Sequence, residues 1–318
     1  MEKGMRRAII LAAAAIALLA VALVLLAQSR EEPQITGAAI TELGLDYRLL
    51  FCSETDCREE MRKLINSSGT ADCAMYNFHE SLASGNLRVV ADAHYKGNFS
   101  FIRKRNSSGL MHNKFCILDN ITVITGSFNP SSSMKDRNNM LVISSPWLAR
   151  GYSQEFEELW NNLPDKKSVG NKGFLGGAEV GYYFCPEDGC AARVEQAIAN
   201  ASRSVLFMAY SFTHRGIANE LIIASMRGVY VRGNIDSSSD KDAYYLLRNQ
   251  SIDIRIDAAK GIMHHKVFII DNETVITGSF NPTKSADVRN DENMLVIRSG
   301  GIAEEYLKEF DEVSMVSR

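Results

Sequence analysis

Two stretches of the chain, MHNKFCILDNITVITGSFNP at residues 111–130 and MHHKVFIIDNETVITGSFNP at residues 263–282, carry almost the same twenty residues. Every side chain able to do chemistry in the first copy recurs in the second, and 152 residues separate His112 from His264. A repeat of this length and position predicts a tandem duplication in which both copies are needed.

The similarity extends well beyond the twenty residues. Residues 71–92 parallel residues 204–236, and in both segments a helical stretch lies between two apolar strand-like runs. Downstream, a strand-like run leads into an amphipathic helix in each half. The first half is shorter and lacks most of a helix. Alternating strands and helices predict an α/β protein with two similar lobes, each a mixed β-sheet flanked by helices, related by a pseudo-two-fold axis.

At 318 residues the chain suits two lobes, each with its own core. We expect the first lobe at residues 31–163 and the second at residues 181–318. Residues 164–180 are rich in Gly and Lys and begin with a Pro, which predicts a linker.

The N-terminus predicts membrane attachment. Residues 8–27 carry no charged or polar side chain, and about 20 apolar residues can span a bilayer. Basic residues come before this run and acidic residues follow it, so residues 1–30 are predicted to be a cytoplasmic tip and transmembrane signal anchor, with both lobes outside the cytoplasm. A cleaved signal peptide, which would give a secreted protein, is the alternative.

The cysteines agree with export. Cys52 and Cys57 form one C-x4-C pair, and Cys185 and Cys190 form another. Two local disulfides are the simplest interpretation in an oxidising compartment, and a zinc site is the alternative. The remaining two cysteines lie in apolar runs and are expected to be buried, inert thiols: Cys73 and Cys116.

The charge balance gives a weak indication of the partner. A net charge of −3 and a pI near 6.1 count against a dedicated nucleic-acid binder. The basic run FIRKRNSS at residues 101–108 is expected to be a solvated loop. The alternative is a lip that recruits phosphate backbones or anionic headgroups.

Both copies satisfy the pattern H-x-K-x4-D-x6-G-S-x-N. The first copy has His112, Lys114, Asp119, Gly126, Ser127 and Asn129, and the second has His264, Lys266, Asp271, Gly278, Ser279 and Asn281. The pattern resembles that of the phospholipase D superfamily, and the resemblance covers nearly all of residues 45–318. The second copy is most similar to the small bacterial endonucleases and mitochondrial cardiolipin-hydrolase-like members. Those act as dimers of single-motif chains, whereas this chain carries both motifs, so we expect it to be active without oligomerisation.

The motif residues suit phosphodiester chemistry. Histidine serves as nucleophile or as acid, because both protonation states coexist near neutral pH. One imidazole would form a phosphohistidine, while the other protonates the leaving oxygen and then activates water. Two Lys and two Asn would hold the phosphoryl oxygens in place of a metal ion, so no cofactor is expected. The resemblance implies that His112 is the nucleophile and His264 the acid, an order that the residues alone leave open.

The other motif residues are expected to support the site. The two Asp precede turns and suit a structural role, the two Ser can add hydrogen bonds to phosphate or to the loop, and the two Gly suit backbone geometry. Glu292 matches the position where the superfamily places a carboxylate that orients a catalytic histidine. The first half has Asn138 at that position, and Asp136 is a candidate to compensate.

Nucleic acid is the expected substrate, and phospholipid is the main alternative. Nucleic acid is favoured by the resemblance of the second motif and by small lobes with little room for a lipid pocket. Phospholipid, as for a phospholipase D or cardiolipin hydrolase, is favoured by the membrane anchor and the acidic balance. A phosphatidyltransferase and a non-catalytic phosphate-binding protein are further alternatives.

Overall fold

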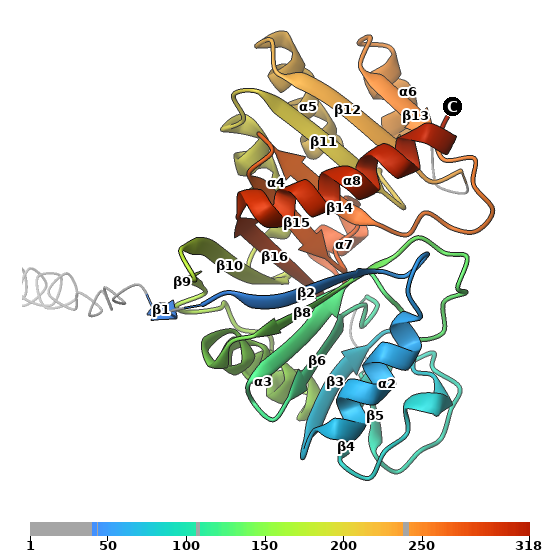
Figure 1. Cartoon of the computed structure of the whole chain (residues 1–318), viewed down its shortest axis with the longest axis vertical. Helices are drawn as coiled ribbons and strands as arrows, with labels where there is room; N and C mark the ends of the chain where they lie inside the picture. Colours follow the sequence, from blue (N-terminus) through green and yellow to red (C-terminus); the bar gives the residue numbers. More distant parts are fainter. Residues whose placement is uncertain (1–39, 43, 106–108, 238–241) are drawn as a thin grey trace, which may run out of the picture. The chain divides into compact units, whose positions relative to one another are not determined.

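The computed structural model describes residues 40–42, 44–105, 109–237 and 242–318 (Figure 1). These belong to one compact unit, Ala39–Arg318. The predicted anchor at residues 1–30 lies outside the described residues, and among those that are described no helix combines the length and apolarity of a membrane span.

The first half builds a seven-stranded sheet in the order β2-β8-β7-β6-β3-β4-β5. Its strands are β2 (Asp46–Phe51), β3 (Ala71–Met75), β4 (Leu87–Asp92), β5 (Ile102–Arg105), β6 (Lys114–Leu118), β7 (Thr122–Gly126) and β8 (Asn139–Ser144). Strands β3, β4 and β5 pair in parallel and the other pairs are antiparallel. Its helices are α2 (Cys57–Ser67), the short 3₁₀ helix η1 (Glu80–Leu82) and α3 (Pro146–Trp160).

The second half builds a nine-stranded sheet in the order β1-β9-β10-β16-β15-β14-β11-β12-β13. Its strands are β1 (Ile40–Glu42), β9 (Lys172–Leu175), β10 (Ala178–Cys185), β11 (Ser204–Ala209), β12 (Tyr230–Ile235), β13 (Asp253–Ile256), β14 (Lys266–Ile270), β15 (Thr274–Gly278) and β16 (Glu292–Arg298). Its helices are α4 (Cys190–Ala199), α5 (Arg215–Met226), α6 (Asp242–Arg248), α7 (Lys284–Val288) and α8 (Gly300–Val316).

The two sheets repeat one topology. Starting from β2 in the first sheet and β10 in the second, seven strands follow in matching order, which confirms the expected pair of mixed sheets with helices. The helix missing from the first half is also explained, because η1 occupies the connection that α5 makes in the second half.

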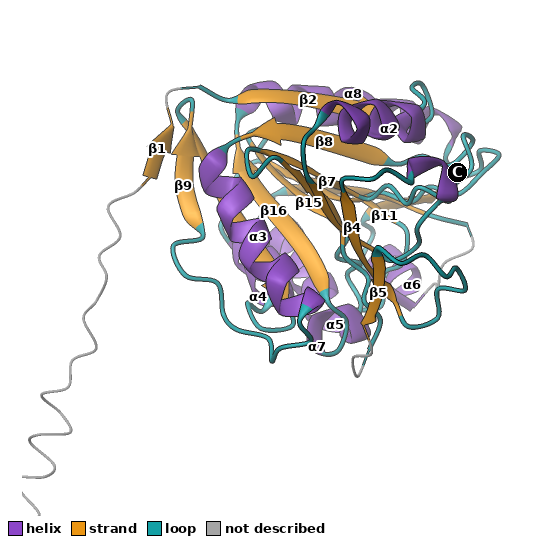
Figure 2. Ribbon diagram, turned by 90° about the horizontal axis from the view of Figure 1, so that it is seen from below, coloured by secondary structure: helices purple, strands orange, loops and turns teal. Residues whose placement is uncertain are grey.

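The segment expected to be a linker is partly a strand. Residues 172–175 form β9, in which buried and exposed side chains alternate as in a half-buried strand. Gly176 and Gly177 both have positive φ and join β9 to β10 in a tight turn, which explains the glycine-rich composition. Strand β1 pairs with β9 in parallel, so the first described strand completes the sheet of the second half (Figure 2).

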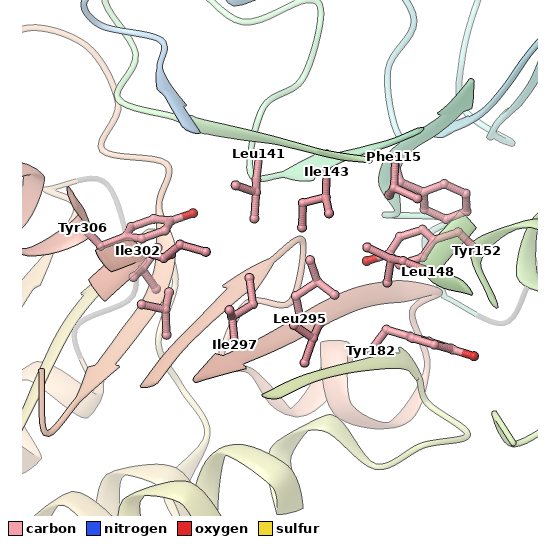
Figure 3. Close-up of a cluster of buried hydrophobic side chains, with 14 of the residues drawn as sticks. Phe115, Leu141, Ile143, Leu148, Tyr152, Tyr182, Leu295, Ile297, Ile302 and Tyr306 are labelled. Atoms are coloured by element: carbon pink, nitrogen blue, oxygen red, sulfur yellow. The ribbon is translucent and has the colours of Figure 1, made fainter. Parts of the chain in front are cut away.

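The largest apolar core lies between the two halves. Leu141 and Ile143 of β8 point toward Leu295 and Ile297 of β16, and aromatic side chains of α3 and α8 extend the cluster (Figure 3). Two further clusters lie against α2 and against α4 and α5. Burial of this shared apolar surface fixes the two halves against each other, which a site shared between them requires.

The structure contains three disulfides. Cys52–Cys57 and Cys185–Cys190 confirm the two predicted local pairs. The expectation of two inert thiols was wrong, because Cys73 and Cys116 form the third disulfide. These two cysteines are register partners on the antiparallel strands β3 and β6, with Cα atoms 4.0 Å apart. That pairing depends on strand register, which the residue spacing does not give.

Candidate active site

The two motifs meet because each one pairs with the other half of the chain. Met111 forms a bridge with Asp291, and Met263 forms one with Arg137. In consequence the backbone N–H of His112 donates to the carbonyl of Asp291 at 2.9 Å, and that of His264 donates to the carbonyl of Arg137 at 2.8 Å. The backbone around each histidine is therefore held by the opposite lobe.

Glu292 of the second half orients His112 of the first half. Both carboxylate oxygens lie 2.8–2.9 Å from His112 Nδ1. The carboxylate also accepts hydrogen bonds from the Ser279 hydroxyl at 2.5 Å and from Asn290 Nδ2 at 3.2 Å. Since a carboxylate accepts, Nδ1 of His112 carries the hydrogen and the lone pair lies on Nε2.

His264 has two neutral partners instead of a carboxylate. Its Nδ1 lies 2.8 Å from Asn138 Oδ1 and 3.0 Å from the Ser127 carbonyl oxygen, both contributed by the first half. Both partners are acceptors, so Nδ1 again carries the hydrogen and Nε2 is left for chemistry. Asn138 thus occupies the position that Glu292 has in the other half.

Asp136 does not compensate for the missing carboxylate. Its two oxygens accept hydrogen bonds from the backbone N–H groups of Ser133 and Ile262, each at 3.0 Å. It therefore holds a turn and the chain segment that leads to His264.

The two lysines share the site with the histidines. Lys114 Nζ donates to the His112 carbonyl and Lys266 Nζ to the His264 carbonyl, each at 2.8 Å. Burial lowers the pKa of Lys114 to about 7, and burial together with the charge of Lys114 holds the pKa of Lys266 well below its usual range. An anion bound beside the two ammonium groups would offset both effects.

The titrating groups influence one another across the halves. Burial, followed by the charges of both lysines, holds the pKa of His112 well below its usual value. The pKa of His264 is lowered by burial and then by Lys266, Lys114 and His112. Burial raises the pKa of Glu292 to about 7. Two histidines, two lysines and one carboxyl group therefore form a single electrostatic unit.

A comparison of the chain with known families agrees with this arrangement. The family described as "Cardiolipin synthase, PLD-like domain" matches residues 35–160 and 194–314, which is well over half of the chain. The chain belongs to the phospholipase D superfamily. It is accordingly a phospholipase D-like phosphodiesterase, as its sequence motifs predicted.

Individual relatives of the superfamily cover different parts of the chain. The phospholipase D of Rickettsia prowazekii is 37% identical over 195 residues, which are 55% of this chain and 93% of that protein. The mitochondrial cardiolipin hydrolase of Xenopus laevis is 32% identical over 133 residues, or 40% of this chain and 63% of that protein. The phosphatidylserine synthase of Haemophilus influenzae shares the fold over 86% of this chain and 87% of its own, with a TM-score of 0.66 and 11% identity.

The asparagines of the phospholipase D motif lie in the loops that follow β7 and β15. Asn129 and Asn281 are half-buried, and each has a buried Oδ1 without a hydrogen-bond partner among the described residues. The serines of the motif donate hydrogen bonds to Asn138 and Glu292, which are the orienting residues of His264 and His112. Ser127 donates to Asn138 Oδ1 at 3.2 Å, just as Ser279 donates to Glu292.

The glycines of the motif are required by the backbone. Gly126 has φ +141° and Gly278 has φ +138°. A Cβ at either position would collide with the carbonyl of Asn139 or of Asn293, respectively. Both glycines therefore allow β7 to approach the start of β8, and β15 to approach the start of β16, where the orienting residues lie.

The aspartates of the motif lie at the far end of the hairpins. Asp119 and Asp271 have φ of 53° and 55° and open the turns β6–β7 and β14–β15. Asp119 accepts from the backbone N–H of Thr70 at 2.8 Å. Burial raises the pKa of Asp271, yet hydrogen bonds from three successive backbone N–H groups, those of residues 202–204, bring it below its usual value. These contacts make the aspartates structural.

Two tyrosines beside the histidines were missed from the sequence. The Tyr76 ring lies 5.1 Å from the His112 ring, and the Tyr210 ring lies 4.8 Å from the His264 ring. Lys114 Nζ and Lys266 Nζ lie 5.6 and 5.1 Å from the respective ring centroids. The sequence could have indicated them, because both tyrosines occupy the same position in the repeat, directly after β3 and β11.

The expected solvated loop at residues 101–108 contains strand β5. The Arg103 guanidinium stacks 4.1 Å from the Trp160 ring. Arg105 is buried and pairs with Asp165 at 2.6 Å and with Asp291 at 3.4 Å. Two of the basic side chains are therefore committed to contacts within the fold.

Proposed function

We propose that this phosphodiesterase works through a covalent phosphohistidine on His112, with His264 as general acid and base. The observation that carries the assignment is the difference between the two Nδ1 partners. The Glu292 carboxylate makes His112 Nε2 more basic and stabilises the positive charge of a phosphorylated imidazole. The neutral acceptors at His264 stabilise its imidazolium less than a carboxylate would, so this imidazolium is the stronger acid.

In the first step, His112 Nε2 attacks phosphorus and the bond from phosphorus to the leaving oxygen breaks. His264 Nε2 gives its proton to that oxygen, so an alcohol departs and His264 becomes neutral. The negative phosphodiester raises the pKa of His264 from its low value in the empty site, which supports its protonated state at the start.

In the second step, neutral His264 removes a proton from water and the resulting hydroxide attacks phosphorus. The phosphorus–nitrogen bond breaks, a phosphomonoester leaves, and His112 returns to its starting tautomer. Lys114 and Lys266, with Asn129 and Asn281, stabilise the phosphoryl oxygens in both steps, which is the role a metal ion has in other phosphodiesterases. An alcohol in place of water would make the reaction a transfer.

We propose a phospholipid headgroup ester as the substrate class, in place of the nucleic acid that the sequence favoured. The net charge of −3 argues against a basic surface for nucleic acid. Arg103 and Arg105 also contact Trp160 and Asp165 of the same chain, so they are less available to bind phosphates. The phospholipase D of Rickettsia prowazekii and the cardiolipin hydrolase of Xenopus laevis carry names of lipid-directed enzymes.

Exposed apolar side chains close to the site in sequence also support a lipid substrate. Met134, Ile262 and Val288 are 52%, 39% and 45% exposed. Met134 and Val288 each lie four residues before an orienting residue, and Ile262 lies two residues before His264. Exposed apolar groups near a reactive centre fit the surface of a bilayer better than a nucleic acid.

The three disulfides and the apolar run at residues 8–27 support a location outside the cytoplasm. We propose that residues 1–30 anchor the chain and hold the catalytic lobes near a membrane surface. Cleavage of the N-terminal segment would give a secreted enzyme instead.

The test uses the full chain in detergent with excess chelator. Headgroup release from mixed micelles of phosphatidylglycerol and cardiolipin is compared with cleavage of single- and double-stranded DNA and RNA, with His112→Ala as the blank. We expect lipid turnover that survives chelation. Nucleic-acid cleavage without lipid turnover would refute the substrate, and loss of all activity on chelation would refute the metal-free mechanism.

A further inference from the structure

The second half of the chain contains a buried acid–histidine pair that the mechanism above does not use. His265 follows the catalytic His264, is 0% exposed, and its Nε2 lies 2.8 Å from Glu309 Oε1 of α8. The Glu309 side chain is 1% exposed. Burying such a pair carries a large desolvation cost, so the pair is expected to have a function.

A continuous chain of hydrogen bonds connects this pair to His264. Asn139 Nδ2 lies 3.0 Å from His265 Nδ1, and the backbone N–H of Asn139 donates to Ser127 Oγ at 3.0 Å. The Ser127 hydroxyl donates to Asn138 Oδ1 at 3.2 Å, and Asn138 Oδ1 lies 2.8 Å from His264 Nδ1. The chain crosses from the second half into the first and back.

The direction of each bond is determined by its neighbours. Asn139 Oδ1 accepts from the hydroxyls of Thr277 at 3.0 Å and Tyr306 at 3.2 Å, which leaves Asn139 Nδ2 as the donor to His265. His265 Nδ1 is then an acceptor, and His265 Nε2 carries the hydrogen that Glu309 accepts. With this tautomer both ring nitrogens of His265 have a hydrogen-bond partner.

A second connection runs through Arg137. Its guanidinium lies 3.8 Å from Glu309 Oε1, and its backbone carbonyl accepts the N–H of His264 at 2.8 Å. Glu309 is therefore linked to the His264 ring through Asn139 and Asn138, and to the His264 backbone through Arg137.

The first half lacks this arrangement at the equivalent positions. Asn113 replaces His265, and neither Asn113 Oδ1 nor Asn113 Nδ2 has a hydrogen-bond partner among the described residues. Glu155 of α3 replaces Glu309, and burial raises its pKa well above the usual range. His112 already contacts a carboxylate directly, through Glu292.

We infer that Glu309 and His265 are positioning residues that hold His264 in its Nδ1–H tautomer through Asn139, Ser127 and Asn138. Each catalytic histidine is thus supported by one carboxylate. Glu292 contacts His112 directly, whereas Glu309 acts on His264 through the hydrogen-bond chain. This indirect link keeps a neutral acceptor on His264 Nδ1, which preserves the acidity of its imidazolium while still fixing the ring. The catalytic part of this inference rests on the proposed roles of His112 and His264.

The variants Glu309→Gln and His265→Asn test the inference, and the symmetric changes Glu155→Gln and Asn113→Ala are the matched controls. The full chain in detergent, with ¹⁵N-labelled histidine, contains six imidazoles. Long-range ¹H–¹⁵N spectra then report the tautomer of His264 without any need for activity, once His264→Ala has assigned its signals. Thermal unfolding checks that each variant is folded, and Glu309→Gln, which keeps the shape of the side chain, serves if His265→Asn does not fold.

We expect Glu309→Gln and His265→Asn to shift His264 toward a mixture of tautomers, while both controls leave it unchanged. We also expect kcat for an ester with an alkoxide leaving group to fall about 10- to 100-fold, with KM unchanged. The burst of nitrophenolate from bis(p-nitrophenyl) phosphate should persist, because that leaving group needs no proton.

An unchanged His264 tautomer in both variants would overturn the inference, as would an equal effect in the control variants. A changed tautomer in a protein whose wild type forms no phosphohistidine would leave the positioning intact and refute the proposed function. Loss of the burst together with turnover would refute an action through the general acid.

Discussion

Glu292, from the second half of the chain, holds Nδ1 of His112, from the first half, at 2.8 Å. The reciprocal contact joins Asn138 of the first half to His264 of the second at the same distance. Neither half therefore contains an oriented histidine by itself. The duplication supplies two incomplete half-sites, and the interface between them completes both.

The variants that lack one or the other histidine should be blocked at different steps of the reaction. His112→Ala and His264→Ala are both expected to abolish turnover of an ester with an alkoxide leaving group. With ³²P-labelled substrate that carries a nitrophenolate leaving group, His264→Ala should accumulate phosphohistidine, because attack proceeds without an acid whereas hydrolysis lacks its base. His112→Ala should accumulate none.

Acid-quenched samples separated by gel electrophoresis would show the trapped protein, with the double variant as the blank. Label trapped on His112→Ala and absent from His264→Ala would reverse the assigned roles. Substantial turnover in either single variant would rule out a site shared between the halves.

The pH profile should be narrow and centred near neutrality. Burial places the pKa of Glu292 and that of Lys114 both at about 7 in the empty site. As pH falls through 7, Glu292 becomes neutral and ceases to support His112. As pH rises through 7, Lys114 loses the charge that holds the phosphoryl oxygens. The profile of kcat/KM, which reports the free enzyme, should therefore decline on both sides.

The variant Glu292→Gln separates the two sides of this profile. It should lower kcat/KM at pH 7 by at least about tenfold and remove the decline on the acidic side, because no carboxyl group remains to titrate there. The decline on the alkaline side should stay. An acidic limb that persists unchanged in Glu292→Gln would show that another group causes it.

The third disulfide should matter more for stability than the local ones. Cys73 and Cys116 close a loop with a sequence separation of 43, against 5 for Cys52 and Cys57. The loop-entropy relation gives about 4 kcal/mol for the longer loop and about 2 kcal/mol for the shorter one.

Denaturation in urea would compare the double variants Cys73→Ala/Cys116→Ala and Cys52→Ala/Cys57→Ala with the wild-type protein. The first should lose more free energy of unfolding than the second. A smaller loss from the Cys73/Cys116 pair would mean that loop closure does not govern the stability of this fold.

The repeated motif was sufficient to predict much of the molecule. His112, Lys114 and their counterparts in the second copy indicated the superfamily, the mixed sheets and the phosphodiester chemistry. The C-x4-C spacing, together with the predicted export, also favoured the disulfides Cys52–Cys57 and Cys185–Cys190 over a zinc site, and both are present. Each of these features depends on residue types at fixed distances along the chain.

The tertiary structure decided whatever depends on register and on contacts between distant segments. The Cys73–Cys116 disulfide follows from the alignment of β3 with β6, and strand β9 in the expected linker follows from its pairing with β10 and β1. The cross-half contact of Glu292 with His112, and the link from Glu309 through His265 to His264, arise only when the two halves pack. The sequence by itself identified the groups that we propose to perform the chemistry, because their types and spacing are local properties. Their partners were determined by packing, because burial of the shared apolar core brings together residues far apart in the chain, such as His112 and Glu292, which are 180 positions apart.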